Sequence, residues 1–147
     1  MGVKVNFKKL NGRAITPTYA SEYSAGADLY ACVEGEVEIR PHETVVVPTG
    51  IAVELPVGYA GLIYARSGLA TKKGLAPANK VGVVDCDYRG EVKVALHNHS
   101  KETQKIEGGE RIAQLVITPY LKAQFEESET LSETVRGEGG FGSTGTK

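Results

Sequence analysis

The stretch Glu91-Val92-Lys93-Val94-Ala95-Leu96 (residues 91–96) decides the fold class of this chain. Its apolar side chains recur at every second position, which is the period of a β-strand with one buried face. Residues 3–7 and 37–39 alternate in the same way. Further short β-rich runs span residues 44–47, 51–55, 61–65 and 111–117. Many short strands, separated by proline and glycine turn signals, predict an antiparallel sandwich or barrel.

Only residues 67–73 have a helical pattern in this otherwise strand-rich chain. Ser67 is the predicted N-cap, and Gly74 is predicted to follow the last helical turn. A chain of 147 residues without an internal repeat or linker is expected to form one domain with its own core. The sequence therefore predicts an all-β domain with one short helix.

Charge and composition argue against several classes of protein. The formal net charge is −1 and there is no basic stripe, so a nucleic-acid polymer is not the expected partner. There is no apolar run near the ~20 residues of a membrane span and no charged-then-apolar leader, so we expect no membrane association and no secretion. Cys32 and Cys86 stand alone in the sequence, which favours free thiols over a disulfide. We expect a cytoplasmic protein.

The chain contains only three aspartates, and all of them have apolar or glycine neighbours. Asp28 stands in Ala-Gly-Ala-Asp-Leu, at the expected start of a strand. Asp85 and Asp87 stand in Gly-Val-Val-Asp-Cys-Asp-Tyr-Arg-Gly. A buried carboxylate is costly unless it is paired, hydrogen-bonded or near a metal, so these residues are candidates for a functional site. For Asp87, which precedes Tyr-Arg-Gly, a turn is the favoured interpretation.

Arg66, Ser67 and Gly68 lie where a predicted strand meets the predicted helix. The first N–H groups of a helix have no partners within the helix, and an adjacent guanidinium adds positive charge, so the junction is suited to bind an anion. An ordinary capped turn is the alternative interpretation.

Polar residues in two other predicted strand regions are also candidates. Residues 79–91 are predicted to form two strands joined by a tight turn. Asn79 could read a base edge, Asp85 could hold a water and take its proton, and Tyr88 could support a sugar. Their alternatives are a turn asparagine, a carboxylate satisfied by the backbone, and a core tyrosine. Gln114 lies within an apolar strand, where a structural hydrogen-bonding role is more common.

The last twelve residues, 136–147, include five glycines and are predicted to be mobile without a ligand. Arg136 can pair with phosphate, Phe141 can stack on a base, and Ser143 and Thr144 offer hydroxyls. The segment therefore predicts a lid that orders over a nucleotide phosphate. Its glycine spacing is not that of a dinucleotide fold, because no helix can follow, nor of a P-loop, because Ser143 replaces the lysine. A disordered tail is the alternative.

Taken in order, five segments resemble the five motifs of the homotrimeric deoxyuridine triphosphatase (dUTPase) family. They are Ala-Gly-Ala-Asp-Leu (25–29), Arg-Ser-Gly-Leu (66–69), Gly-Val-Val-Asp-Cys-Asp-Tyr-Arg-Gly (82–90), Gly-Glu-Arg-Ile-Ala-Gln-Leu (109–115) and Arg-Gly-Glu-Gly-Gly-Phe-Gly-Ser-Thr-Gly (136–145). The resemblance implies a jelly-roll core in residues 1–135 and a flexible glycine-rich lid in residues 136–147. It also implies a homotrimer with shared active sites, in which the C-terminal tail is exchanged between subunits.

The resemblance further implies roles for individual residues. Asp85 resembles the carboxylate that activates the attacking water, and Tyr88 the ring that leaves no room for a 2′-hydroxyl. Asp28 resembles the residue that anchors Mg²⁺ through water, the ion being held mainly by the substrate phosphates. The implied catalytic residues are Asp85, Gln114, Ser67 and Arg66. The implied substrate-binding residues are Arg66, Ser67, Gly68, Asn79, Gly82, Val83, Val84, Asp85, Tyr88, Lys93, Gln114, Arg136, Phe141, Gly142, Ser143 and Thr144.

The implied activity is the Mg²⁺-dependent hydrolysis of dUTP to dUMP and pyrophosphate, by attack of water on the α-phosphate. Such an enzyme keeps uracil out of DNA and supplies dUMP for dTTP synthesis. Two alternatives are a dCTP deaminase-like nucleotide enzyme and a nucleotide-sensing interaction module. The deaminase signature is missing, and an intact set of five motifs argues against a protein that only binds.

Overall fold

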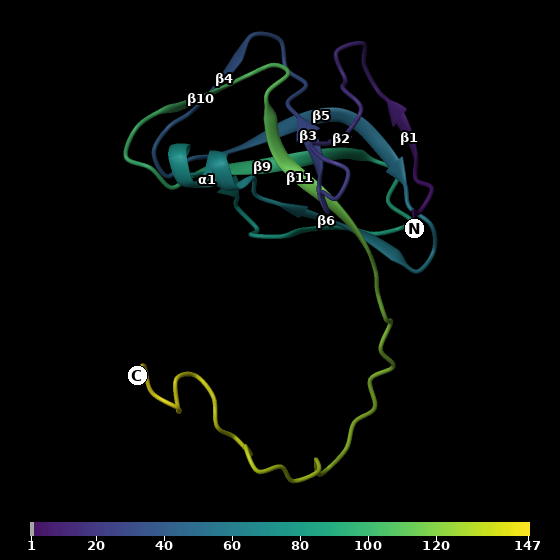
Figure 1. Ribbon diagram of the computed structural model, residues 1–147, viewed down its shortest axis with the longest axis vertical. Coiled ribbons are helices and arrows are strands. Elements are labelled where there is room, and N and C mark those ends of the chain that lie inside the picture. Colours follow the sequence, from purple (N-terminus) through teal and green to yellow (C-terminus); the bar gives the residue numbers. More distant parts are fainter. Residues whose placement is uncertain (1) are drawn as a thin grey trace.

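The computed structural model describes residues 2–147 and has the predicted all-β architecture with one short helix (Figure 1). Its elements in chain order are β1 (Asn6–Lys9), β2 (Thr18–Tyr19), β3 (Ala27–Tyr30), β4 (Glu36–Ile39), β5 (Thr44–Glu54), β6 (Tyr59–Tyr64), α1 (Ser67–Lys73), β7 (Leu75–Pro77), β8 (Gly82–Val84), β9 (Glu91–Asn98), β10 (Gln104–Glu107) and β11 (Arg111–Pro119). All strand pairs are antiparallel. They form sheets in the orders β1-β5-β9-β7, β10-β4 and β2-β3-β11-β6-β8. These sheets are open, so the fold is a sandwich and not a closed barrel.

Residues 91–96 form part of strand β9 with one buried face, as their alternation predicts. In β9 the side chains of Val92, Val94 and Leu96 are buried, while Lys93 is exposed on the opposite face. The buried side chains join a single hydrophobic cluster that draws on most of the strands and on α1. Burial of one face of each strand, worth about 25 cal/mol per Å² of apolar surface, is therefore what holds the sheets together.

One strand, β5, replaces the two that were expected at residues 44–47 and 51–55. The prediction that Pro48 separates two strands is wrong, because the pairing with β9 shifts register between Pro48 and Ala52. This irregularity accommodates the missing N–H of proline within the strand. Gly50 adopts φ +70° there, and a Cβ at this position would lie 2.6 Å from the sulfur of Cys32. The chain can therefore continue through the bulge without breaking the sheet.

The helix has the predicted bounds, but its N-cap differs from the prediction. Arg66 occupies the N-cap position with extended backbone angles, and no side chain caps the helix. Ser67 is instead the first helical residue, and its carbonyl accepts a hydrogen bond from Thr71 Oγ1. Gly74 has the left-handed conformation that was expected after the last turn. The hydroxyl of Ser67 is thus not needed to cap the helix.

Of the two strands expected within residues 79–91, only β8 lies there, since β9 begins at Glu91, and the two do not form a hairpin with each other. β8 pairs with β6, whereas β9 pairs with β5 and β7 in a different sheet. The connection over residues 85–90 therefore crosses from one sheet to the other. Asp87 lies in a turn within this connection, as predicted. We call residues 85–90 the crossing turn.

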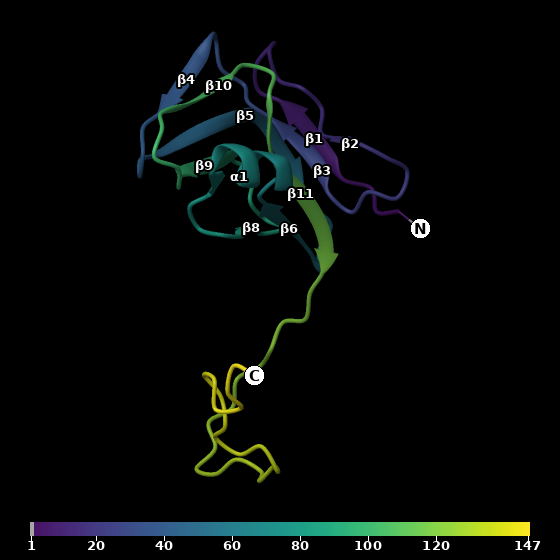
Figure 2. The ribbon, with the colours of Figure 1, turned by 60° about the vertical axis from the view of Figure 1, so that its left-hand side comes forward.

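The chain beyond β11 leaves the body of the molecule as an extended tail. In both views it runs away from the strands, and its C-terminus lies far from the sheets (Figures 1 and 2). The large apolar side chains of Leu121, Phe125, Leu131 and Val135 are exposed along it. The division between a core ending at residue 135 and a lid beginning at residue 136 stays a prediction. Among the described residues, no helix is long and apolar enough to span a bilayer.

Candidate active site

A cavity of about 380 Å³ brings together residues from the first, second and fourth motifs. Its lining residues are Ala20, Ser24, Ala25, Gly26, Asp28, Tyr64, Arg66, Ser67, Gly68, Gln114 and Val116. The strand order explains the convergence, because β11 lies between β3 and β6 and sets Gln114 opposite both Asp28 and Tyr64. We call this cavity the arginine pocket. All five residues that were predicted to act around the phosphates from these motifs (Asp28, Arg66, Ser67, Gly68 and Gln114) line it.

Asp28 is buried in the arginine pocket and is neutralised by two arginines. Arg66 Nε donates to Asp28 Oδ1 at 2.9 Å, and Arg111 Nη1 lies 3.6 Å from Asp28 Oδ2. The Arg66 side chain is 28% exposed and that of Asp28 only 10%, so this pair is far less screened by solvent than an ordinary surface ion pair. Because Asp28 engages the Nε of Arg66, it orients the guanidinium along one edge.

Gln114 makes a structural hydrogen bond, which was the alternative to a role in binding phosphate. Its Nε2 donates to the carbonyl of Ala65 at 2.8 Å, directly before Arg66. Gly26 makes room for this arrangement, since a Cβ there would lie 3.0 Å from Cβ and Cδ of Gln114 and closer still to its Oε1. The glutamine side chain therefore connects the first motif to the backbone that presents Arg66.

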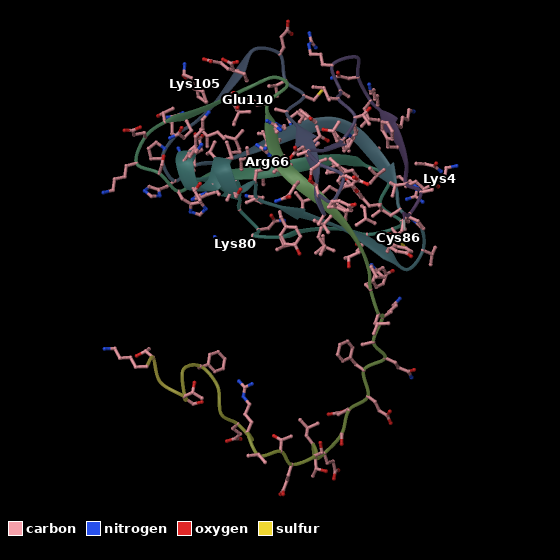
Figure 3. The ribbon with its side chains drawn as sticks, in the orientation of Figure 1. Lys4, Arg66, Lys80, Cys86, Lys105 and Glu110 are labelled. Carbon is pink, nitrogen blue, oxygen red and sulfur yellow. The ribbon has the colours of Figure 1, made fainter. Side chains whose placement is uncertain are left out.

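A second cavity, of about 360 Å³, gathers the residues predicted to bind the nucleoside. It is lined by Ile63, Asn79, Gly82, Val83, Val84, Asp85, Tyr88, Glu91, Val92 and Lys93. We call it the aspartate pocket. It shares no lining residue with the arginine pocket. In Figure 3, the labelled Arg66 marks the first pocket and the labelled Cys86 marks the crossing turn of the second.

Asp85 is exposed in this chain, so the expectation that it is buried was wrong. The prediction assumed that the apolar residues before it would enclose it, but only Val84 is buried, and Asp85 begins the crossing turn at the end of β8. Within residues 2–147 its carboxylate makes neither a hydrogen bond nor an ion pair. It is therefore available to a ligand or a water.

Tyr88 forms a wall of the aspartate pocket and is not a core residue. Its ring covers Gly90, where a Cβ would lie 2.6 Å from Tyr88 Cζ. Its hydroxyl donates to the carbonyl of Glu91 at 2.8 Å, which fixes the ring from its far end. Tyr88 remains 44% exposed, so one side of the ring is open to a ligand. Asn79 is also exposed and lies in a turn at the edge of the same pocket.

Sequence reasoning missed two residues, one that contacts Asp28 of the arginine pocket and one that lines the aspartate pocket. Arg111 was noted only as part of a motif, although it is the second cationic partner of Asp28. Glu91 was not considered, yet its Oε2 is buried without a hydrogen-bond partner among the described residues. An acidic residue at the end of a turn is common, so no local signal distinguishes it. An arginine directly before the buried residues of a strand was a weak signal for Arg111.

The tail residues lie apart from both pockets. Figure 3 shows their side chains standing away from the body of the molecule. Arg136 Nε donates to the carbonyl of Gly139 at 2.7 Å, and Phe141 is fully exposed. The base of the tail does touch the crossing turn, where Cys86 Sγ lies 3.8 Å from the Tyr120 hydroxyl. This hydrogen bond raises the pKa of Tyr120.

Comparison with known proteins agrees with this geometry. The dUTPase family model matches residues 12–145. A deoxyuridine 5′-triphosphate nucleotidohydrolase of Hydrogenobaculum sp. is 53% identical over 99% of this chain and 100% of its own length. One from Syntrophotalea carbinolica is 48% identical over 97% of each chain.

Solved structures give the same result. A glycine-to-serine mutant of a Staphylococcus bacteriophage 80alpha dUTPase, with dUpNHpp, superimposes with a TM-score of 0.87, at 31% identity, over 97% of this chain and 99% of that one. This similarity confirms the expected jelly-roll fold. Sequence and structure together show that the chain belongs to the dUTPase family.

Proposed function

We propose that this protein is a dUTP diphosphatase, which hydrolyses dUTP to dUMP and pyrophosphate. The observation that carries the proposal is that the two pockets offer different chemical groups, in a chain that belongs to the dUTPase family. One pocket presents arginine, hydroxyl and amide groups suited to phosphate, and the other presents a free carboxylate beside an aromatic wall. A triphosphate and a nucleoside need these two kinds of surface.

Asp85 is the proposed general base. Its carboxylate is exposed at the edge of the aspartate pocket and makes no side-chain contact that would have to break. It can orient a water and accept its proton as the water attacks the α-phosphorus in line. The bond from the α-phosphorus to the bridging oxygen then breaks, and pyrophosphate leaves.

The arginine pocket is proposed to hold the phosphates. Arg66 can donate through the edge of its guanidinium that Asp28 leaves free, and Ser67 adds a hydroxyl that no cap requires. The space beside Gly68 is open, since no atom lies within 4 Å of a Cβ placed there, and a phosphate could occupy it. These donors would stabilise the charge that develops on the pyrophosphate, and Gln114 would keep them in position through the Ala65 carbonyl.

The donor set of the arginine pocket fits a Mg²⁺ ion that arrives with the substrate. Asp28 is the one carboxylate lining that pocket, and nowhere in residues 2–147 do three or more His, Cys, Asp or Glu side chains form a metal site. Mg²⁺ usually keeps several waters and binds one or two carboxylates together with substrate phosphates. Since its oxygens already face arginines, Asp28 would hold the hydrated ion through water. When bound, the ion neutralises charge on the phosphates.

The aspartate pocket is proposed to select the deoxyuridine. Asn79 offers both a donor and an acceptor, and the backbone around Gly82, Val83, Val84 and Lys93 would complete the recognition of uracil. Tyr88 would lie against the deoxyribose. Its hydroxyl is held by the Glu91 carbonyl and its ring lies close to Gly90, so the ring would leave no room for a 2′-hydroxyl.

A shared active site in a homotrimer accounts for the separation of the pockets. They share no lining residue, so we propose that the arginine pocket of one subunit faces the aspartate pocket of another. The exposed apolar side chains of the tail fit a segment that packs on a neighbouring subunit. The tail residues proposed to close over the nucleotide from there are Arg136, Phe141, Gly142, Ser143 and Thr144. We place this activity in the cytoplasm, where it would keep uracil out of DNA and supply dUMP.

Pyrophosphate release from a panel of nucleotides tests the proposed function. The purified protein is incubated at substoichiometric concentration with dUTP, dCTP, dTTP and UTP, with and without Mg²⁺. We expect multiple turnovers with dUTP and Mg²⁺ only. Ammonia release from dCTP would identify a deaminase instead, and binding of dUTP without turnover would identify a nucleotide sensor.

Truncation after Arg136 tests the lid. Apart from the half-buried Gly139 and Gly140 the removed residues are exposed, and none of them belongs to the hydrophobic core, so the oligomer and its unfolding transition should be unchanged. The turnover number for dUTP should fall by about 10- to 100-fold, because the closed site loses its phosphate and base contacts. A truncated protein that no longer assembles would show that these residues act in assembly and not as a lid.

A further inference from the structure

The crossing turn has few backbone hydrogen bonds of its own, although it carries Asp85 and Tyr88. It connects strands of different sheets, so no ladder bonds run along it. Within the turn, the backbone N–H of Tyr88 donates to the carbonyl of Asp85 at 3.1 Å. A turn with one such bond is expected to be mobile unless side chains hold it. The position of the proposed base therefore depends on side-chain contacts.

Arg89 supplies these contacts from within the turn. Its Nη1 donates to the carbonyl of Cys86 at 2.7 Å and to that of Tyr88 at 3.3 Å. The same guanidinium closes the backbone on both sides of Asp87. Hydrogen bonds from a charged donor are roughly twice as strong as neutral ones, and the planar fork of arginine can bridge acceptors that a lysine meets only one at a time.

The other end of the guanidinium is tied to the sandwich. Arg89 Nη2 lies 3.4 Å from Glu54 Oε1 at the end of β5, and Glu54 Oε2 accepts a hydrogen bond from Asn6 Nδ2 at 3.0 Å. Asn6 and Glu54 are direct partners in the β1–β5 pairing. A continuous path of contacts thus runs from a paired strand edge through Arg89 to the backbone next to Asp85.

We propose that Arg89 is a positioning residue for the reaction, which acts by holding the crossing turn so that Asp85 and Tyr88 keep their places at the nucleotide. The inference rests on the proposed function of that pocket. As an isolated surface ion pair, Arg89 and Glu54 would contribute little, because both side chains are 54% exposed. The effect comes from the two carbonyls, since a small displacement of a catalytic group can lower the rate by about 10²-fold.

The chain offers a matched control for this arginine. Arg13 pairs with Glu34 at the same 3.4 Å, with both side chains exposed, and lines neither proposed pocket. Arg89→Gln and Arg13→Gln therefore remove the same charge and a similar surface pair. We expect Arg89→Gln to lower the turnover number for dUTP by about 10- to 100-fold, with a smaller change in KM. Arg13→Gln should have the wild-type turnover number.

Two further variants separate positioning from folding. Arg89→Lys keeps the charge but not the fork, and should show an intermediate turnover number even if Arg89→Gln does not fold. Glu54→Gln should lower the turnover number by a few fold in the wild type and have no effect in the Arg89→Gln background, because it acts through the charged side chain at residue 89.

The possible results distinguish this inference from the proposed function. If the wild type does not hydrolyse dUTP, the proposed function fails. If the wild type is active and Arg89→Gln or Arg89→Lys turns over dUTP at the wild-type rate, the positioning role of Arg89 is overturned. Equal losses in Arg89→Gln and Arg13→Gln would also overturn it, since the effect would then come from surface charge.

Discussion

The arginine pocket and the aspartate pocket each contain an aspartate, but the two carboxylates have opposite surroundings. Asp28 is buried on β3, an interior strand of its sheet, and faces Arg66 and Arg111. Asp85 is exposed on the crossing turn, and within residues 2–147 its side chain contacts no cation or hydrogen-bond donor. Both follow short apolar or glycine-rich runs in the sequence, so the difference arises from the sheets and not from the neighbouring residues.

This difference separates a carboxylate that organises a site from one that can do chemistry. A carboxylate held by two guanidinium groups keeps its place, and its main effect is to orient those groups. A carboxylate without a partner can bind a water and accept a proton. The arginine pocket is therefore stabilised by its own contacts, whereas the aspartate pocket depends on a ligand and on the turn that presents it.

Asp85→Asn should have the largest effect on activity and almost none on stability. An amide cannot accept the proton of the attacking water, so the turnover number should fall by about 10²- to 10⁴-fold. The free energy of unfolding should change by less than about 0.5 kcal/mol, because the side chain is exposed and unpaired. Pyrophosphate release, dUTP binding and denaturant unfolding provide the measurements. Near-normal turnover would refute the assignment of Asp85 as the base.

Asp28→Asn should show the opposite pattern, with a clear loss of stability. The change leaves Arg66, and the half-exposed Arg111, without the buried counter-charge of Asp28, and after solvent screening of Arg111 we expect a cost of about 1 to 2 kcal/mol in the free energy of unfolding. Denaturation at a fixed protein concentration measures this cost, and Glu34→Gln, which breaks an exposed pair, is the control. An unchanged free energy of unfolding would mean that the arginines do not depend on Asp28.

Most of the strands could be predicted from local patterns, and many of the pocket residues could be predicted from the five motifs. Alternation in residues 91–96 predicts a strand with one buried face. Gly74 was expected after the helix because glycine readily adopts the left-handed conformation found there. The motifs that resemble the dUTPase family named the residues that line the two pockets. What these successes share is that each depends on residues close together in the chain.

The failures concern contacts between residues far apart in the chain. The N-cap prediction was wrong because Arg66 occupies that position and turns its side chain to Asp28, and the sequence near Ser67 contains no sign of this pairing. The hairpin expected in residues 79–91 was wrong because β8 pairs with β6. The exposure of Asp85 follows from that pairing, which ends the strand just before it. Such partners are decided by packing of the whole domain.

Gly26→Ala tests how much the stability of the arginine pocket depends on close packing. An added Cβ would overlap the Gln114 side chain, which would have to abandon its hydrogen bond to the Ala65 carbonyl. We expect a loss of about 1 to 2 kcal/mol in the free energy of unfolding from this overpacking. The turnover number for dUTP should fall by a few fold, because the backbone before Arg66 loses its anchor.

Gly12→Ala provides the matched control, since no atom lies within 4 Å of a Cβ placed at that exposed position. It should change the free energy of unfolding by less than about 0.5 kcal/mol. If Gly26→Ala leaves the free energy of unfolding as unchanged as Gly12→Ala does, the Gln114 side chain can adopt another conformation at little cost. The arginine pocket would then not depend on close packing. A loss confined to Gly26→Ala would sharpen the contrast with the aspartate pocket, where Asp85 can be changed without cost to the fold.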